Sequence, residues 1–212
     1  MNLPNILRTA APLVIVTLAP LASAQSSYAP PVGDAPAAEL FKLPAEKRTL
    51  NKSLGAKYDT GRAEVFVNAP VSSVKASVTD YANYAKIIPR FEKAKLLKRS
   101  GASADVYLMI PILKGAANVW SVQHFEAPVT TGKLETINGK SLQGNVDALN
   151  TRWTYRAVDA THSVLSCEIY VEPKLPVPAG AIATEAQRAA AAAVNSVRAH
   201  AEDASKKLAG NP

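Results

Sequence analysis

The sequence contains very little cysteine and histidine. A single cysteine, Cys167, occurs in 212 residues, which excludes an internal disulfide framework even in an oxidising compartment. It lies in the alternating segment "SVLSCEIYV", where we expect a buried, unreactive thiol. The three histidines, His124, His162 and His200, show no metal-ligand spacing, so we expect no metal site.

Motifs of several other functional classes are also missing. There is no G-x-S-x-G segment of a serine hydrolase, and no glycine-rich phosphate loop follows a predicted strand. The chain is basic, with 24 lysines and arginines against 17 acidic residues, but these charges are mixed rather than gathered in one stripe. We therefore expect no cofactor and no nucleic acid partner. The positive charge serves solubility or a weak contact with an anionic membrane surface.

The apolar stretch near the N-terminus is too short to span a bilayer comfortably. It reads "TAAPLVIVTLAPLA", begins at Thr9, and follows a short segment with one arginine. Ala22 and Ala24 then give the small-x-small pattern that a signal peptidase needs. Residues 1–24 are predicted to be a cleaved signal peptide, with Gln25 as the mature start; the alternative is an uncleaved membrane anchor. We expect an exported protein, periplasmic or secreted.

Residues 25–60 are rich in proline and alanine and have no sustained period. This composition predicts a flexible leader that contains at most a short helix near 37–43. The domain itself is predicted over 61–208, and residues 209–212 form a tail.

The beginning of the predicted domain combines one strand with two short helices. The segment "RAEVFVNAP" alternates and ends at Pro70, which suits the first turn of a helix. Valines then recur at helical spacing over 71–78. A second short helix, about 82–88, is ended by Pro89, so the chain must turn sharply before it enters a sheet.

Six short strands and a long helix complete the domain. Turn residues separate the strands too closely for parallel crossovers, which favours an antiparallel meander. The helix is predicted over 184–208, where Thr184 and Gln187 fit a capping box. Its inner stripe is mostly alanine and comprises Ala186, Ala190, Ala193, Val197, Ala201, Ala204 and Leu208. Such small side chains let the helix lie close to the sheet or leave volume unfilled where the sheet curves away. The strands are predicted at 92–99, 105–113, 119–126, 133–138, 149–158 and 163–171.

Two segments and the order of the elements resemble a known family. The segment "VFVNAPVSSVKASVTDYANYAKIIPRFEKAKLL" (65–97) is similar to the first strand, helical elbow and second strand of the polyketide cyclase and coenzyme-Q-binding branch of the START-like (SRPBCC) superfamily. The segment "RWTYRAVDATHSVLSCEIYVEPKLPVPAGAI" (152–182) resembles its last hairpin and the approach to its closing helix. The resemblance implies an α+β helix-grip fold. In this fold a curved antiparallel sheet of about seven strands wraps a long C-terminal helix, and two short helices follow the first strand.

The resemblance also implies a cavity between the sheet and the helix. We expect an exported, monomeric binding protein that holds a hydrophobic or amphipathic small molecule there, such as a lipid, quinone, sterol or polyketide-like compound. Burial of about ten carbon atoms contributes on the order of 8 kcal/mol before ordering costs. The predicted lining residues are Tyr81, Tyr84, Leu108, Met109, Trp120, Val122, Trp153, Ile169, Ala190 and Val197. Of Leu108 and Met109, which alternate along one strand, only one is expected to face the cavity, and the two tyrosines could instead pack the elbow onto the sheet.

The main alternative is an enzyme of the cyclase or dehydratase type that acts on a polyketide-like or aromatic substrate in the same cavity. Such an enzyme needs one or two buried acid–base groups. The candidates are His124 with Tyr107 or Glu135, although His124 could equally lie on the solvent face. Arg152 and Glu168 are expected to point to solvent, where they could pair across a hairpin. A third possibility is an interaction protein whose cavity is filled by its own side chains.

Overall fold

The structure is a computed structural model that describes residues 33–52, 55–112, 117–174 and 176–209. The predicted signal peptide, residues 1–24, lies outside the described residues. In the described part of the chain, no helix is both long enough and apolar enough to cross a membrane.

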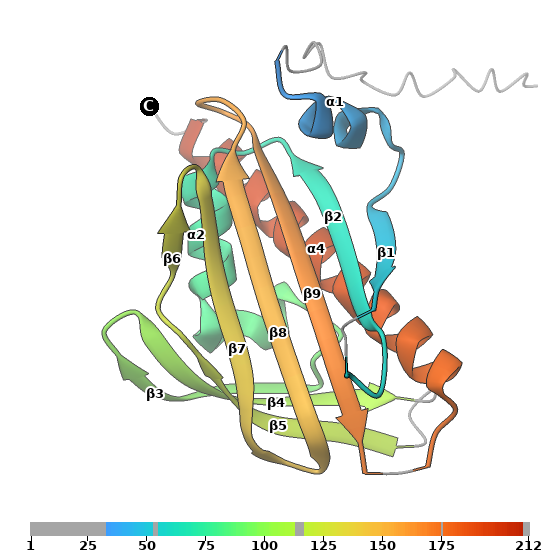
Figure 1. The fold of residues 1–212 in the computed structure, drawn as a ribbon. Helices are drawn as coiled ribbons and strands as arrows, with labels where there is room; N and C mark the ends of the chain where they lie inside the picture. The colour runs from blue at the N-terminus through green and yellow to red at the C-terminus, as the bar shows by residue number, and fades with distance from the viewer. Residues whose placement is uncertain (1–32, 53–54, 113–116, 175, 210–212) are drawn as a thin grey trace, which may run out of the picture.

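The chain has the predicted α+β architecture, with one curved antiparallel sheet and a long C-terminal helix (Figure 1). The helical elements are α1 (Ala35–Lys42), α2 (Val71–Thr79), the 3-10 turn η1 (Tyr81–Asn83), α3 (Tyr84–Ile87) and α4 (Ala179–Ala209). The strands are β1 (Lys47–Asn51), β2 (Thr60–Val67), β3 (Lys93–Ser100), β4 (Ser103–Ile112), β5 (Ala117–Phe125), β6 (Val129–Thr131), β7 (Leu134–Gly144), β8 (Val146–Ala157) and β9 (Ser163–Pro173). The short strands β1 and β6 are additional to the seven that the sequence predicts.

The sheet has nine strands; eight follow the order β1-β2-β9-β8-β7-β5-β4-β3, and β6 pairs with the beginning of β7. Every pairing is antiparallel. Figure 1 shows β7, β8 and β9 running along the length of the molecule, whereas β3, β4 and β5 cross its lower end. This curvature gives the sheet an inner face toward α4 and an outer face away from it.

Helix α4 lies directly on β2 at Gly61. A Cβ added to Gly61 would lie 2.2 Å from the backbone nitrogen of Gln187. Ala63, Ala186 and Ala190 are almost fully buried in the same core. Because these residues are small on both elements, helix and strand approach more closely than larger side chains would permit. The inner face is therefore tightly packed at β2.

The helical elbow, formed by α2, η1 and α3 after β2, anchors the other end of the core. Tyr81 and Tyr84 are almost completely buried, and the Tyr81 ring stacks on Phe125 at a centroid distance of 4.8 Å. The Tyr84 hydroxyl donates a hydrogen bond to the Val78 carbonyl. The helical run ends at Ile87, and Ile88 leaves the helical region (φ −118°, ψ 89°), as the following Pro89 predicts.

Part of the predicted leader is folded onto the outer face of the sheet. Helix α1 agrees closely with the predicted helix near 37–43, and Ala37 and Leu40 pack with Phe66 and Val164. Strand β1 then pairs with β2. An ion pair between Arg156 and Asp34 holds the start of α1 against β8.

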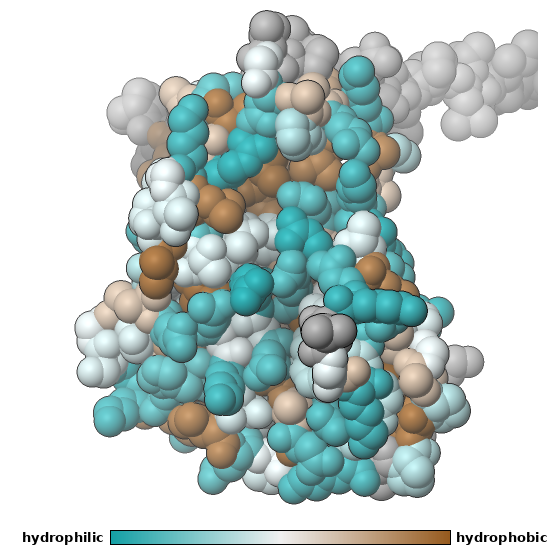
Figure 2. Space-filling model, in the orientation of Figure 1, coloured by the Kyte–Doolittle hydropathy of each residue, from teal (hydrophilic) through white to brown (hydrophobic). Residues whose placement is uncertain are grey.

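The rest of the outer face is mostly hydrophilic, as Figure 2 shows for the side of the sheet that faces the viewer. Arg62 and Glu168 form an ion pair at 2.6 Å, and Arg152 lies 3.6 Å from the same carboxylate. The prediction that Arg152 and Glu168 face outward and could pair across the hairpin is confirmed, since the two residues are also direct partners in the β8–β9 register.

The segment "NGKSLQGN", predicted as a break, continues as strand. Strand β7 runs to Gly144 and β8 begins at Val146. Gly139 does not form a turn there: a Cβ added to it would lie 2.7 Å from a ring carbon of Phe125. This glycine therefore marks a close contact within a strand. Glycine in such a segment is typical of a turn as well, so the sequence alone did not distinguish the two.

Candidate ligand-binding cavity

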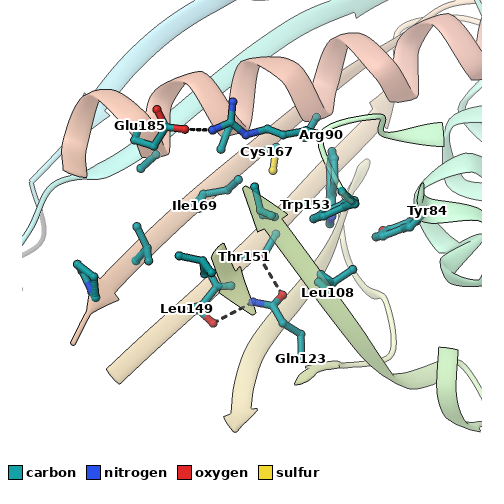
Figure 3. A pocket seen from close by; sticks show the side chains of 18 of the residues that line it. Tyr84, Arg90, Leu108, Gln123, Leu149, Thr151, Trp153, Cys167, Ile169 and Glu185 are labelled. Atoms are coloured by element: carbon teal, nitrogen blue, oxygen red, sulfur yellow. Dashed lines mark hydrogen bonds and ion pairs between the residues drawn. The ribbon is translucent and has the colours of Figure 1, made fainter. Parts of the chain in front are cut away.

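A cavity lies between the first half of α4 and the inner faces of β4, β5, β8 and β9 (Figure 3). The sheet side is built from aliphatic and aromatic residues such as Leu108, Trp153 and Ile169. On the helix side, α4 contributes Ile182, Glu185 and three alanines, at 186, 189 and 193. The small alanine side chains that permit contact with β2 thus leave space where the sheet curves away from the helix.

The cavity is narrow. Its volume is about 90 Å³, within about 850 Å³ of space free of protein atoms when the open mouth is included. A cavity of about 150 Å³ holds one benzene molecule. The interior as it stands therefore admits a chain or part of a ring, and a bulkier ligand must displace lining side chains or widen the mouth.

One amide crosses the apolar wall of the cavity. Gln123 on β5 is fully buried; its Nε2 donates to the Leu149 carbonyl at 3.0 Å, and its Oε1 accepts from Thr151 Oγ1 at 3.1 Å. Both bonds tie β5 to β8 across the sheet (Figure 3). Because burial without partners is costly for an amide, these bonds hold Gln123 in place rather than leave it free to react.

The charged groups of the lining lie together near α4. Arg90, which follows the elbow, forms an ion pair with Glu185 of α4. Figure 3 shows this pair on the side of the cavity opposite Gln123. Burial, and next the nearby positive charge of Arg188, lower the pKa of Arg90 from its usual range. The local positive charge is thus only partly compensated.

The other ionisable groups of the described lining are neutral at physiological pH. Burial raises the pKa of the Cys167 thiol and holds the pKa of the Tyr84 hydroxyl well above its usual value. The expected buried thiol at Cys167 is confirmed. In the described ranges, no cluster of three or more His, Cys, Asp or Glu side chains could hold a metal ion.

The predicted lining residues fall into three groups. Tyr84, Leu108, Trp153 and Ile169 line the cavity. Tyr81, Ala190 and Val197 are buried in the same core but are not part of the lining. Met109, Trp120 and Val122 lie on the outer face of β4 and β5, because Leu108 and Gln123 occupy the inner positions.

None of the three candidate catalytic residues belongs to the cavity lining. His124 is on the outer face, with Nδ1 2.6 Å from the Asp105 carboxylate. Tyr107 is also on the outer face and stacks on Trp120 at a centroid distance of 6.0 Å. Glu135 pairs instead with Lys75 of α2, 2.6 Å away, and accepts a bond from the Tyr155 hydroxyl at 3.3 Å.

A family model described as polyketide cyclase / dehydrase and lipid transport matches residues 67–198, which is more than half of the chain. The chain belongs to this family. The match begins at the end of β2 and ends within α4, so it includes the elbow and every strand that lines the cavity. Among curated proteins, none matches the sequence.

Solved structures share the fold of this family member at low identity. A STAR-related lipid transfer protein from Xanthomonas axonopodis has a TM-score of 0.65 at 17% identity, covering 75% of this chain and 94% of its own. Human STARD10 has a TM-score of 0.61 at 11% identity, covering 82% and 79%. The Zhui aromatase/cyclase from Streptomyces sp. R1128 has a TM-score of 0.50 at 20% identity, covering 68% and 93%. These similarities establish the helix-grip fold.

Sequence reasoning missed four polar residues of the cavity in this family member: Arg90, Gln123, Thr151 and Glu185. Gln123 is adjacent to His124 in β5 and lies on the opposite face, so assigning the other face of β5 to the cavity would have identified Gln123. Arg90 directly follows the proline that ends the elbow, a position at which the chain re-enters the core. Glu185 lies one residue before the predicted alanine stripe on the same helix.

Proposed function

We propose that the protein binds a hydrophobic or amphipathic small molecule in the cavity between α4 and the sheet and acts as its carrier. The observation that supports this is the lining: apart from Gln123, Thr151, the Cys167 thiol and one ion pair, the described wall is aliphatic and aromatic. Transfer of apolar groups from water into such a wall contributes roughly 0.8 kcal/mol per CH₂, with no catalytic group required.

Opening of the cavity is part of this proposal. Since the interior volume is about 90 Å³, a lipid-sized molecule must enter with its chain first while side chains near the mouth move. The alanines of α4 limit this obstruction, because they place no long side chains between the helix and the β8–β9 wall. The ion pair between Arg90 and Glu185 joins the elbow to α4 and must adjust when a ligand passes.

The geometry favours a carrier over a cyclase or dehydratase. His124, Tyr107 and Glu135 do not converge on the cavity, and each already has a partner elsewhere. Within the described lining, Tyr84 and Cys167 are neutral, and the two charged groups are paired with each other. A general acid–base pair needs groups that can exchange protons near neutral pH.

The proposal includes export as a monomer, with the ligand as the main partner and at most a weak contact with anionic membranes. The export part of this proposal rests on the N-terminal pattern of a short basic segment, an apolar stretch and Ala22–Ser23–Ala24. The mass of the protein isolated from its own host tests this directly: a chain that begins at Gln25 supports cleavage and export, and an intact N-terminus contradicts them.

Binding can be tested with the neutral apolar probe N-phenyl-1-naphthylamine, whose fluorescence rises in apolar surroundings. We expect saturable binding of one probe per chain. Ala189→Phe, which places a ring in the cavity, should weaken binding by about tenfold or more. Ala199→Phe is the matched control, because Ala199 is exposed on the same helix and outside the lining, and it should leave binding unchanged. Equal binding by both variants, or no binding by the native protein, contradicts the proposal.

A further inference from the structure

The cavity carries unpaired hydrogen-bond donors. Two residues of its lining have a buried polar atom that pairs with no atom of the described residues: Arg90 at Nε and Trp153 at Nε1. Both atoms are N–H groups, which can only donate. The other buried atoms without a partner, in Tyr81, Ser121 and Asn195, belong to residues outside the lining. The cavity therefore lacks acceptors rather than donors.

The charges near Arg90 also favour an acceptor, in this case an anionic one. Arg90 and Arg188 lie close enough to repel each other, and Glu185 is the acid paired with Arg90. One negative charge is thus set against two positive charges at the edge of an apolar space. A guanidinium has five N–H donors, and one carboxylate cannot satisfy all of them. An additional anionic group at this position would gain charge-assisted hydrogen bonds from the guanidinium.

The polar groups at the two ends of the cavity differ in whether their hydrogen-bonding capacity is already satisfied. At the side of β5 and β8, Gln123 and Thr151 already satisfy each other and Leu149. At the side of α4, Arg90 and Glu185 point toward one another and form an ion pair (Figure 3). A ligand with one polar end would therefore place its apolar body against Leu108, Trp153 and Ile169 and its polar end at Arg90.

From these contacts we propose that the ligand is an amphiphile with a single anionic head group of the carboxylate type, held by Arg90, and an apolar chain or ring system in the cavity. This proposal rests on the proposed binding function and names the chemistry of its ligand. Glu185 holds Arg90 in the unliganded protein, and the ligand carboxylate competes with it for the guanidinium. A cationic head group would have to compete with Arg90 for Glu185 and would be repelled by Arg90 and Arg188.

The test compares dodecanoate with dodecan-1-ol, which have the same chain length and differ in head group, by displacement of the bound naphthylamine probe at pH 8. We expect the native protein to bind dodecanoate at least about tenfold more tightly than the alcohol. Arg90→Gln should remove this preference while alcohol binding stays within about twofold, which also shows that the variant is folded. Glu185→Gln should strengthen dodecanoate binding, since it removes the competing carboxylate.

Arg198→Gln is the matched control, an arginine of α4 outside the cavity lining, and it should leave both affinities unchanged. Equal affinities for acid and alcohol in the native protein, or a preference that survives in Arg90→Gln, overturn the anionic head group but leave the carrier function standing. Displacement by neither compound overturns both proposals.

Discussion

Gly61 of β2 lies against the backbone of α4 at Gln187, so closely that a Cβ on the glycine would lie 2.2 Å from the Gln187 nitrogen and 2.3 Å from the Ala186 carbonyl carbon. This contact fixes the distance between helix and sheet on one side of the molecule. On the other side, where β4 and β5 curve away, the same helix leaves the cavity open. Tight packing at β2 and free volume at β8 are therefore two results of one helix position.

Gly61→Ala should be strongly destabilising. The added methyl group meets backbone rather than a flexible side chain, so α4 must shift as a whole. We expect a loss of about 1–3 kcal/mol or more in the free energy of unfolding, measured by urea denaturation. Gly180→Ala is the control: no atom lies within 4 Å of its added Cβ, and the helix propensity of alanine should stabilise by up to about 1 kcal/mol. Similar losses in both variants would show that the close contact at Gly61 is not the cause.

The fold could be predicted from the sequence because its order of elements is set by local signals. Pro70 and Pro89 mark the start and the end of the elbow, and both act there as predicted. The alternation in "SVLSCEIYV" predicted which side of β9 is buried, and Cys167 is fully buried. The predicted inner stripe of α4 is buried as far as Ala201, whereas Leu208 at its end is 77% exposed.

The site was harder to predict because a strand face is not determined by the strand alone. In β5, Val119, Ser121, Gln123 and Phe125 face inward, whereas the opposite set contains Trp120 and Val122, the large apolar residues that were predicted to line the cavity. A buried glutamine is acceptable there only because Leu149 and Thr151, far along the chain, supply its partners. Such tertiary compensation leaves no local pattern in the sequence. Glycines inside β7 were read as turns for the same reason.

Gln123→Leu should destabilise the fold even though it makes the cavity more apolar. The change leaves the buried Leu149 carbonyl and the half-buried Thr151 hydroxyl without their partner. A buried group that loses its partner costs about 1–3 kcal/mol, which urea denaturation can measure. Thr151→Ser keeps the hydroxyl that donates to Gln123 and should cost much less. If Gln123→Leu were neutral or stabilising, the amide would have no structural role and a role in ligand recognition would become the better explanation.

Stability should fall at alkaline pH. Burial raises the pKa of Tyr81 to about 12 and raises the pKa values of Tyr84, Tyr155 and Cys167 above their usual values. Above pH 10, unfolded tyrosines lose their protons while these folded ones keep them, so the unfolded state is favoured as the pH rises. Each such group should remove about 1 kcal/mol per pH unit within this window.

The measurement is the free energy of unfolding between pH 8 and pH 11, together with the absorbance of tyrosinate. Three of the seven tyrosines should ionise only when the protein unfolds. A stability that is constant over this range, or ionisation of all seven tyrosines in the folded protein, would contradict the assigned burial.

The thiol of Cys167 should report the opening of the cavity. It is the only thiol in the chain, it is fully buried in the cavity wall, and burial raises its pKa, so it reacts only when the structure opens. We expect a disulfide reagent such as dithionitrobenzoate to label one thiol per chain at once in guanidinium chloride but slowly in the native protein. A bound ligand should slow native labelling further, by the factor by which it stabilises the closed state. Rapid labelling of the native protein would show that the wall is open to solvent, and labelling that bound ligand leaves unchanged would place the ligand elsewhere.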